Sequence, residues 1–145
     1  MAASFADTSF LFSLYGNDVH TERAEAWARQ IGRPITVTVL NRYELGNAMR
    51  FAAFRKVIAE ADALSSLSAF EGDLLTGHLH PVSEDFPAII EEARRLSGLY
   101  TMRGGHRSFD MLHVAAAKVF RAGMFLSFDA GQRKLAVAAG LAAGP

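Results

Sequence analysis

The sequence alternates between short apolar runs and longer stretches in which apolar residues recur every three or four positions. The short runs predict strands, and the longer stretches predict amphipathic helices. The clearest strand is 35–39, in which every residue is β-branched. We expect further strands at 4–6 and 124–128 and, weakly marked, at 80–83 and 141–145. We expect an apolar turn at 10–14 and helices at 21–31, 40–54, 57–78, 85–98, 108–123 and 132–139.

The alternation of strands with helices determines the expected architecture. Parallel neighbours in a sheet need long crossover connections, which helices supply. We therefore expect an α/β fold: a three-layer α/β/α sandwich around a central, mainly parallel sheet of four to five strands. Residues 1–145 are predicted to form a single domain with a helical arm at about 45–79. Ordinary core packing is the alternative interpretation of that segment.

Composition narrows the class of protein. The chain has 145 residues, of which 50% are hydrophobic and 21% charged, as expected for one folded domain. It contains 0 cysteines, which excludes a disulfide scaffold, a thiolate zinc site and a cysteine nucleophile, and which fits a cytoplasmic protein. The first residues lack the basic segment of a signal peptide, and no apolar run reaches the roughly 18 residues that a membrane span needs.

Four acidic residues stand apart from those on the expected solvent faces of helices. Asp7 and Asp129 each end a strand, and Asp110 and Glu44 lie in the first turns of helices. These positions share one edge of a parallel sheet, so we expect the side chains to converge. Close carboxylates repel unless cations neutralise them, and Mg²⁺ or Mn²⁺ with oxygen ligands is the simplest solution. Taken singly, each aspartate could instead cap a helix, and the glutamate could face solvent.

The segments that carry these acids are FADTSFLFSL, NRYELGNAMRF, FDMLHVAAAKV and FLSFDAGQRKLAVAAGL. In order and spacing they resemble the PIN-domain nucleases, and in particular the ribonuclease toxins of VapBC-type toxin–antitoxin pairs. Members of that family have an acidic residue in each such segment. Residue by residue, the resemblance gives the catalytic and metal-binding set Asp7, Glu44, Asp110 and Asp129.

The resemblance also implies a cofactor, a reaction and partners. A PIN-like fold implies one or two Mg²⁺ or Mn²⁺ ions in the acidic pocket and endonucleolytic cleavage of RNA. It implies a protein antitoxin that inserts a peptide near the pocket, and a homodimer; the region at about 45–79 serves both contacts in family members. Ser9 and Ser127, each two positions from an acid, correspond to hydroxyls that help to hold the metal or its waters. Turn and strand-end chemistry is the alternative for both serines.

The expected mechanism is attack by water. Carboxylates hold the cation over the scissile phosphate, where the cation lowers the pKa of a bound water. The resemblance implies a 5′-phosphate product. A metal-free route through the RNA 2′-hydroxyl would need paired histidines, and the five histidines show no such pairing. His113, one helical turn after Asp110, is expected at the helix surface or in a supporting role.

Basic residues are the candidates for RNA contacts. The chain has 15 basic and 15 acidic residues, so setting aside the four site acids leaves 15 against 11, and the remaining surface can attract phosphates. The candidates are Arg42 and Arg50, in the helix of Glu44, and Arg103 and Arg107, in the loop before the next acidic helix. Solvated charge is the alternative interpretation of each arginine.

Two other functions stay open at this level. A catalytically inactive PIN-fold module would bind RNA or protein, although all four acids are retained. A metal-dependent phosphatase of the haloacid dehalogenase type also has an aspartate after its first strand, but it needs a second aspartate where Ser9 stands. The sequence does not specify whether the RNA is transfer, ribosomal or messenger RNA.

Overall fold

The computed structural model describes residues 3–145, which form five strands and seven helices. The strands are β1 (Ser4–Ala6), β2 (Ile35–Val37), β3 (Leu79–Pro81), β4 (Met124–Leu126) and β5 (Ala142–Gly144). The helices are α1 (Thr8–Tyr15), α2 (Thr21–Ile31), α3 (Val39–Phe54), α4 (Glu60–Thr76), α5 (Phe86–Gly104), α6 (Ser108–Val119) and α7 (Ala130–Ala138).

All five strands are parallel, and their order across the sheet is β3–β2–β1–β4–β5. The central strand is β1, in which Phe5 is in register with Thr36 of β2 and with Phe125 of β4. Because the strands run in one direction, their carboxyl ends meet at one edge of the sheet. The predicted α/β sandwich with a parallel sheet is confirmed, and the weakly marked strands near 80 and 142 both belong to it.

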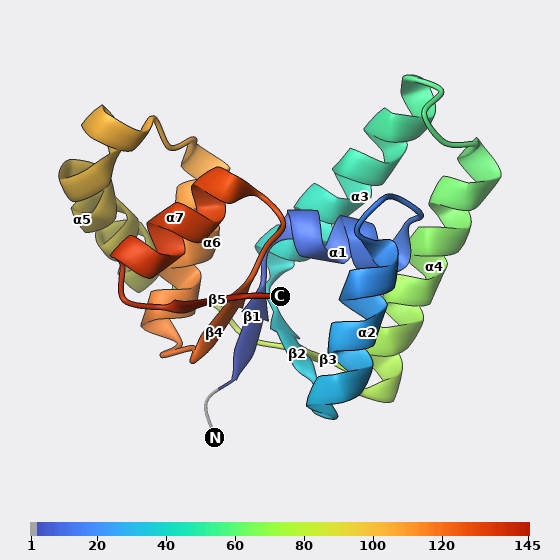
Figure 1. Cartoon of the computed structure of the whole chain (residues 1–145), viewed down its shortest axis with the longest axis horizontal. Helices are drawn as coiled ribbons and strands as arrows, with labels where there is room; N and C mark the ends of the chain where they lie inside the picture. The colour runs from blue at the N-terminus through green and yellow to red at the C-terminus, as the bar shows by residue number, and fades with distance from the viewer. Residues whose placement is uncertain (1–2) are drawn as a thin grey trace.

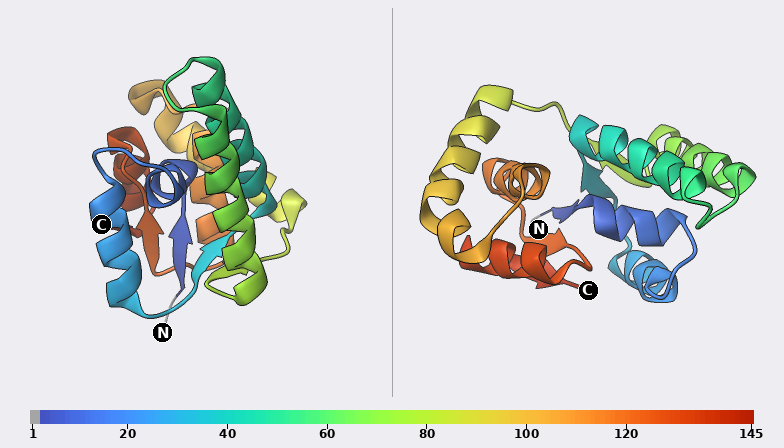
Figure 2. Two further views of the ribbon diagram at one scale, coloured as in Figure 1. Left: turned by 90° about the vertical axis from the view of Figure 1, so that its right-hand side faces the viewer. Right: turned by 90° about the horizontal axis from the view of Figure 1, so that it is seen from above.

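Helices cover both faces of the sheet (Figures 1 and 2). The helices α1 to α4 lie on one side, and α5 to α7 lie on the other. Successive residues of β1 point into the two layers: Ala6 packs in the core with Phe10 and Leu45, and Phe5 packs in the core with Val114. A sheet buried on both faces needs apolar side chains on both, so the strands appear in the sequence as continuous apolar runs.

The segment 10–14, expected as an apolar turn, is instead the middle of α1. Asp7 starts this helix, because its side chain accepts a hydrogen bond from the backbone N–H of Phe10. Phe10 and Leu11 are fully buried, and the neighbouring apolar side chains are partly buried. A helix that packs on most of its sides has no polar face, so its sequence lacks the alternation of apolar and polar residues that identifies an amphipathic helix.

The strand expected at 35–39 is shorter than predicted. It stops at Val37, because Thr38 caps α3. The Thr38 side chain accepts a hydrogen bond from the Asn41 backbone, and the Asn41 side chain accepts one from the Thr38 backbone. This reciprocal capping box satisfies backbone donors at the helix start and outweighs the β propensity of the last two residues.

Two predicted boundaries on the other side of the sheet are also wrong. Gly98 does not end its helix, since α5 continues to Gly104. A single glycine inside a helix costs only about 1 kcal/mol relative to alanine, and the buried stripe of this helix outweighs that cost. The helix expected at 108–123 begins at Ser108 as predicted but ends at Val119, where Phe120 is its C-terminal cap.

The helices α3 and α4 form a hairpin that extends beyond the rest of the molecule (Figure 1). Large apolar side chains stay exposed along this hairpin, namely Val39, Tyr43, Phe51, Phe54, Val57, Leu64 and Leu75. Within residues 3–145, no helix is long and apolar enough to cross a membrane.

Candidate active site

The four acidic residues predicted from the sequence line one pocket of about 480 Å³. Asp7 lies between β1 and α1, and Asp129 lies between β4 and α7. Glu44 comes from α3, and Asp110 comes from the first turn of α6. Because β1 and β4 are neighbours in the sheet, the pocket lies at its carboxyl edge, between the two helical layers.

Asp7 is the buried member of the set, with 2% of its surface exposed. Its Oδ1 accepts hydrogen bonds from the Ser9 hydroxyl (2.7 Å) and the Phe10 backbone (2.9 Å), and its Oδ2 accepts one from the Ser127 hydroxyl (2.6 Å). Burial raises the pKa of Asp7 above its ordinary value, and the bonds from Ser127 and Ser9 offset only part of this effect. The ionised form of Asp7 is therefore less favourable in the folded protein than in the unfolded chain.

The two serines predicted to support the acids lie between Asp7 and Asp129. The Ser127 hydroxyl accepts a hydrogen bond from the Asp129 backbone (3.0 Å), and the Ser9 hydroxyl accepts one from the Phe128 backbone (3.1 Å). The hydroxyls of Ser9 and Ser127 are themselves 3.3 Å apart. The serines thus fix the position of the β4–α7 junction relative to the buried carboxylate.

Glu44 is held by a histidine. The Nε2 of His113 lies 3.0 Å from the Glu44 carboxylate, and its Nδ1 lies 3.4 Å from the Asn41 side-chain amide. Burial alone would raise the pKa of Glu44, but hydrogen bonds from His113 and Thr8 outweigh burial, so that pKa lies below its ordinary value. The expectation of a surface position for His113 is wrong, because only 1% of its surface is exposed.

Asp110 and Asp129 are nearer to solvent. The Asp110 carboxylate accepts a hydrogen bond from the Arg107 Nε (3.1 Å), and this bond raises the pKa of the Arg107 guanidinium. The Arg107 side chain is itself exposed and lines the pocket. Asp129 caps α7 by accepting a hydrogen bond from the Gln132 backbone (2.8 Å).

The predicted RNA-contacting arginines lie in different places. Arg107 lines the acidic pocket, whereas Arg42 and Arg50 line a groove between α3 and α4. Arg42 is paired there with Glu71, with a shortest separation of 2.6 Å. Arg103 is exposed in the last turn of α5. Of these arginines, the structure therefore brings Arg107 to the carboxylates.

Sequence reasoning missed Gln132, which also lines the pocket. This side chain is 3% exposed, and among residues 3–145 its Oε1 has no hydrogen-bond partner. A buried carbonyl oxygen without a hydrogen-bond partner lowers the stability of the fold, and this one lies in the same pocket as the four carboxylates. In the sequence, Gln132 is an ordinary polar residue in a helical first turn, and nothing in the pattern distinguishes it.

A comparison with known families decides the identity of the fold. The PIN domain family matches residues 4–138. The chain belongs to the PIN domain family. Three of the four segments that first suggested the resemblance lie within that match, and the fourth extends three residues beyond it, so the family prediction is confirmed. A comparison with curated proteins found no match.

Solved structures with the same fold include three that align along most of the chain. The VapC20 toxin of Mycobacterium tuberculosis, described as cleaving the sarcin–ricin loop, aligns with a TM-score of 0.66 and 18% identity over 96% of each chain. PAE2754 from Pyrobaculum aerophilum aligns at 0.61 and 16% identity, over 98% of this chain and 90% of that one. FitAcB from Neisseria gonorrhoeae aligns at 0.61 and 15%, over 98% and 96%. At these identities the likeness establishes the fold alone.

The oxygen atoms that line this pocket are of the kind that suits a hard divalent cation. Carboxylates, a carboxamide oxygen and hydroxyls are the ligand types that Mg²⁺ and Mn²⁺ prefer. The buried Asp7 carboxylate and the unpartnered Gln132 oxygen are both groups that a cation would stabilise. Within residues 3–145, no three His, Asp or Glu side chains lie together in an arrangement that could already hold a metal ion. Arg107 engages Asp110 in this structure, and His113 engages Glu44.

Proposed function

We propose that this PIN domain is a metal-dependent endoribonuclease that hydrolyses RNA phosphodiester bonds, and that it is the toxin of a type II toxin–antitoxin pair. The observation that carries the proposal is the convergence of Asp7, Glu44, Asp110 and Asp129 on one pocket. The likeness in fold to a toxin described as cleaving the sarcin–ricin loop supports the choice of RNA as substrate.

The four carboxylates are the proposed ligands of one or two Mg²⁺ or Mn²⁺ ions. When bound, such ions supply a nucleophile by lowering the pKa of water, and they neutralise charge on the phosphoryl oxygens. The chain's own contribution is to position these ligands. Ser9 and Ser127 orient Asp7 by hydrogen bonds, and His113 orients Glu44. Positioned ligands lose little conformational entropy when a cation binds.

Arg107 is the proposed phosphate contact at the pocket. Its exposed guanidinium bonds Asp110 through Nε, which leaves its terminal nitrogens free to donate to a phosphate. Arg42, Arg50 and Arg103 are proposed as more distant contacts along the RNA. All three are exposed to solvent, and salt screens exposed contacts between arginine and phosphate. We therefore expect their contribution to RNA affinity to fall as the salt concentration rises.

The α3–α4 hairpin is the proposed surface for protein partners. It corresponds to the expected arm at about 45–79 of a single domain spanning residues 1–145, and it exposes seven large apolar side chains. Exposed apolar surface of this kind is typical of interaction sites. We assign this surface to a homodimer and to an antitoxin whose peptide reaches the acidic pocket, and we place the protein in the cytoplasm.

The decisive experiment is RNA cleavage by the purified chain, freed of any antitoxin. Total cellular RNA is incubated with Mg²⁺, with Mn²⁺ or with EDTA, using the wild type and the variants Asp7→Asn and Asp129→Asn. Asparagine caps helices as well as aspartate, so both variants should fold. Asp62→Asn is the matched control, because Asp62 is an exposed acid in the first turn of α4.

We expect cleavage that requires the metal, persists in the control and is lost in both site variants. Activity unchanged in the site variants would contradict the assignment of the site. A folded chain that cleaves no RNA with either metal would contradict the nuclease proposal, and would favour a PIN-fold module that binds RNA or protein. Release of phosphate from small phosphomonoesters without RNA cleavage would favour the phosphatase.

A further inference from the structure

A second hollow, of about 390 Å³, adjoins the acidic pocket. The two share Thr8, Ser9, Ala48 and Asp129, so they form one continuous surface. The part beyond the carboxylates is lined by side chains to which the proposed chemistry gives no role. They are Phe12, Ser13, Asp18, His20 and Phe128.

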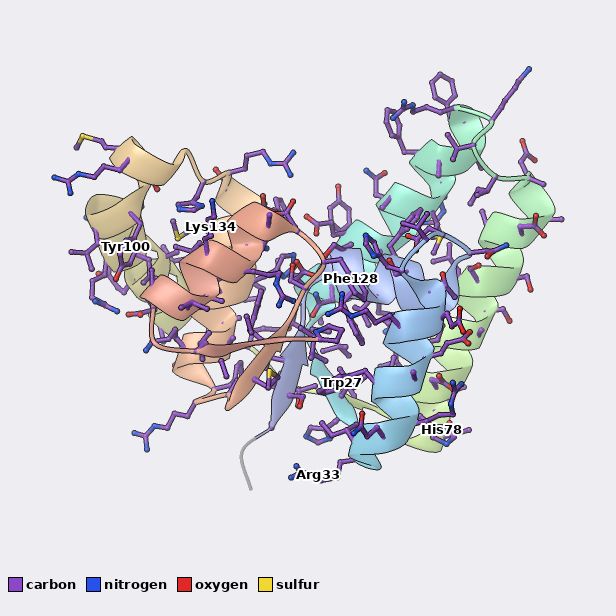
Figure 3. All side chains as sticks on the ribbon, in the orientation of Figure 1. Trp27, Arg33, His78, Tyr100, Phe128 and Lys134 are labelled. Carbon is purple, nitrogen blue, oxygen red and sulfur yellow. The ribbon has the colours of Figure 1, made fainter. Side chains whose placement is uncertain are left out.

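The wall of this hollow is a series of stacked rings. The His20 ring lies nearly parallel to the Phe128 ring, with centroids 4.5 Å apart and an angle of 6° between the planes. Phe128 stacks in turn on Phe10, at 5.7 Å, and Phe10 contacts Trp27 edge to face at 6.1 Å. Phe10 is fully buried and His20 is partly exposed, so the series runs from the core to the hollow. Figure 3 shows Phe128 above Trp27, close to the middle of the molecule.

The outermost ring is held in place. His20 lies in the connection between α1 and α2, where its backbone N–H donates to the Asp18 carboxylate (2.8 Å). That carboxylate also accepts a hydrogen bond from the Ser13 hydroxyl of α1 (2.8 Å). The loop that carries His20 is thereby tied to α1, which begins at the acidic pocket. A fixed ring presents a stacking surface without the entropic cost of ordering a loop.

We propose that His20 and Phe128 form a subsite for one base of single-stranded RNA, next to the phosphate that is cleaved. Splayed bases stack on aromatic side chains, histidine included. Phe128 directly precedes Asp129, so the backbone fixes the distance between the ring and the carboxylate. A base on this stack would therefore set which phosphate reaches the acidic pocket. The inference rests on the proposed RNA cleavage.

The test measures binding in the Asp7→Asn chain, so that RNA is bound without being cut. Short fluorescent oligo(A) and oligo(U) strands carry one abasic nucleotide at each position in turn, and anisotropy gives the affinity of each. Loss of one stacked base should weaken binding about tenfold at a single position. Adding His20→Ala should abolish that dependence, whereas adding His20→Phe should keep it.

The matched control is His78→Ala in the same background, because His78 is an exposed histidine far from Phe128 (Figure 3). It should reproduce the parent profile. A flat abasic profile in the Asp7→Asn chain, together with a wild type that cleaves RNA, would overturn the subsite and leave the nuclease standing. Equal weakening of every strand by His20→Ala, with a lower melting temperature, would assign His20 a purely structural role. Absence of both binding and cleavage would overturn the two proposals together.

Discussion

The imidazole of His113 lies 3.0 Å from the carboxylate of Glu44, deep inside the protein and one turn along the helix from Asp110. Its other ring nitrogen faces the amide of Asn41, which also donates to the backbone oxygen of Ala6 (3.1 Å). The position of Glu44 therefore depends on a buried network that joins α3, α6 and β1. A glutamate held in this way keeps one geometry at the pocket.

We expect His113→Ala to impair both folding and cleavage. The substitution removes one of the hydrogen-bond partners of Asn41, leaves the Glu44 carboxylate without its histidine and opens a cavity, which should lower the free energy of unfolding by about 2–3 kcal/mol. It also frees Glu44, so kcat should fall by at least about tenfold while KM for RNA changes little. Urea unfolding and steady-state kinetics measure the two effects.

The amide variant His113→Gln offers a sharper comparison, because its side chain can still donate a hydrogen bond to Glu44. It should recover part of the lost kcat. If both variants keep the wild-type kcat, the bond between His113 and Glu44 has no part in cleavage, whatever its value for stability.

Asp7→Asn should make the protein more stable at neutral pH and inactive. The pKa of Asp7 is raised by burial, so the folded state binds its proton more tightly than the unfolded state does. The stability from that proton is complete below the unfolded pKa and is lost as the pH rises through the folded pKa. Near pH 7, asparagine avoids this loss and should gain roughly 1 kcal/mol.

The difference between the wild type and Asp7→Asn should shrink as the pH falls towards about 4, because the wild-type carboxyl then becomes neutral. Melting temperatures of both proteins over this range measure it. Millimolar Mn²⁺ should raise the wild-type melting temperature and leave the variant nearly unchanged. A variant that is less stable than the wild type at neutral pH without metal would contradict this account.

Arg107→Gln should have opposite effects on metal and RNA binding. The substitution removes a cation that lies 3.1 Å from Asp110, so Mn²⁺ should bind severalfold more tightly in isothermal titration. It also removes a phosphate contact, so RNA should bind more weakly, with a salt slope lower by about one. Both measurements are made on the same two proteins.

Arg33→Gln is the matched control for this pair of measurements, because Arg33 does not line the acidic pocket and lies far from Phe128, the neighbour of Asp129 (Figure 3). It should leave both affinities as they are. If Arg107→Gln behaves like this control in both titrations, Arg107 is a solvated charge with no role at the site.

Gln132→Leu should separate stability from function. The leucine removes a buried oxygen that lacks a partner, which should stabilise the fold by about 1 kcal/mol. If that oxygen serves the cation, Mn²⁺ affinity and kcat should both fall. Thermal unfolding and Mn²⁺ titration test the two parts, and a destabilised variant with normal Mn²⁺ affinity would show that Gln132 is structural.

The sequence predicts those features that follow from local pattern and sheet geometry. The β-branched run around Ile35 identified a strand, and acids after two strands and in two helical first turns were enough to predict one shared pocket. This worked because a parallel sheet brings the carboxyl ends of its strands together whatever the details of packing. The resemblance to PIN-domain nucleases, rather than sheet geometry, suggested Ser9 and Ser127 as supporting residues, and both donate hydrogen bonds to Asp7.

Features that depend on distant partners were missed. The sequence left His113 either at the helix surface or in a supporting role, and its burial becomes clear only when α3 is packed against α6, which brings in Glu44 from 69 positions earlier. The helix at 10–14 was missed because packing surrounds it and removes its polar face. Gln132 was missed for a similar reason, because the burial of its side-chain oxygen without a hydrogen-bond partner depends on the folded pocket and not on the local sequence.

Asp7 and Asp129 each start a helix as well as line the pocket, and this double role has an evolutionary consequence. Aspartate and asparagine codons differ by one base, and asparagine caps a helix equally well. A single-base mutation can therefore silence the chemistry and leave a folded chain with its α3–α4 surface intact. Descendants of this gene have a short route from nuclease to binding protein.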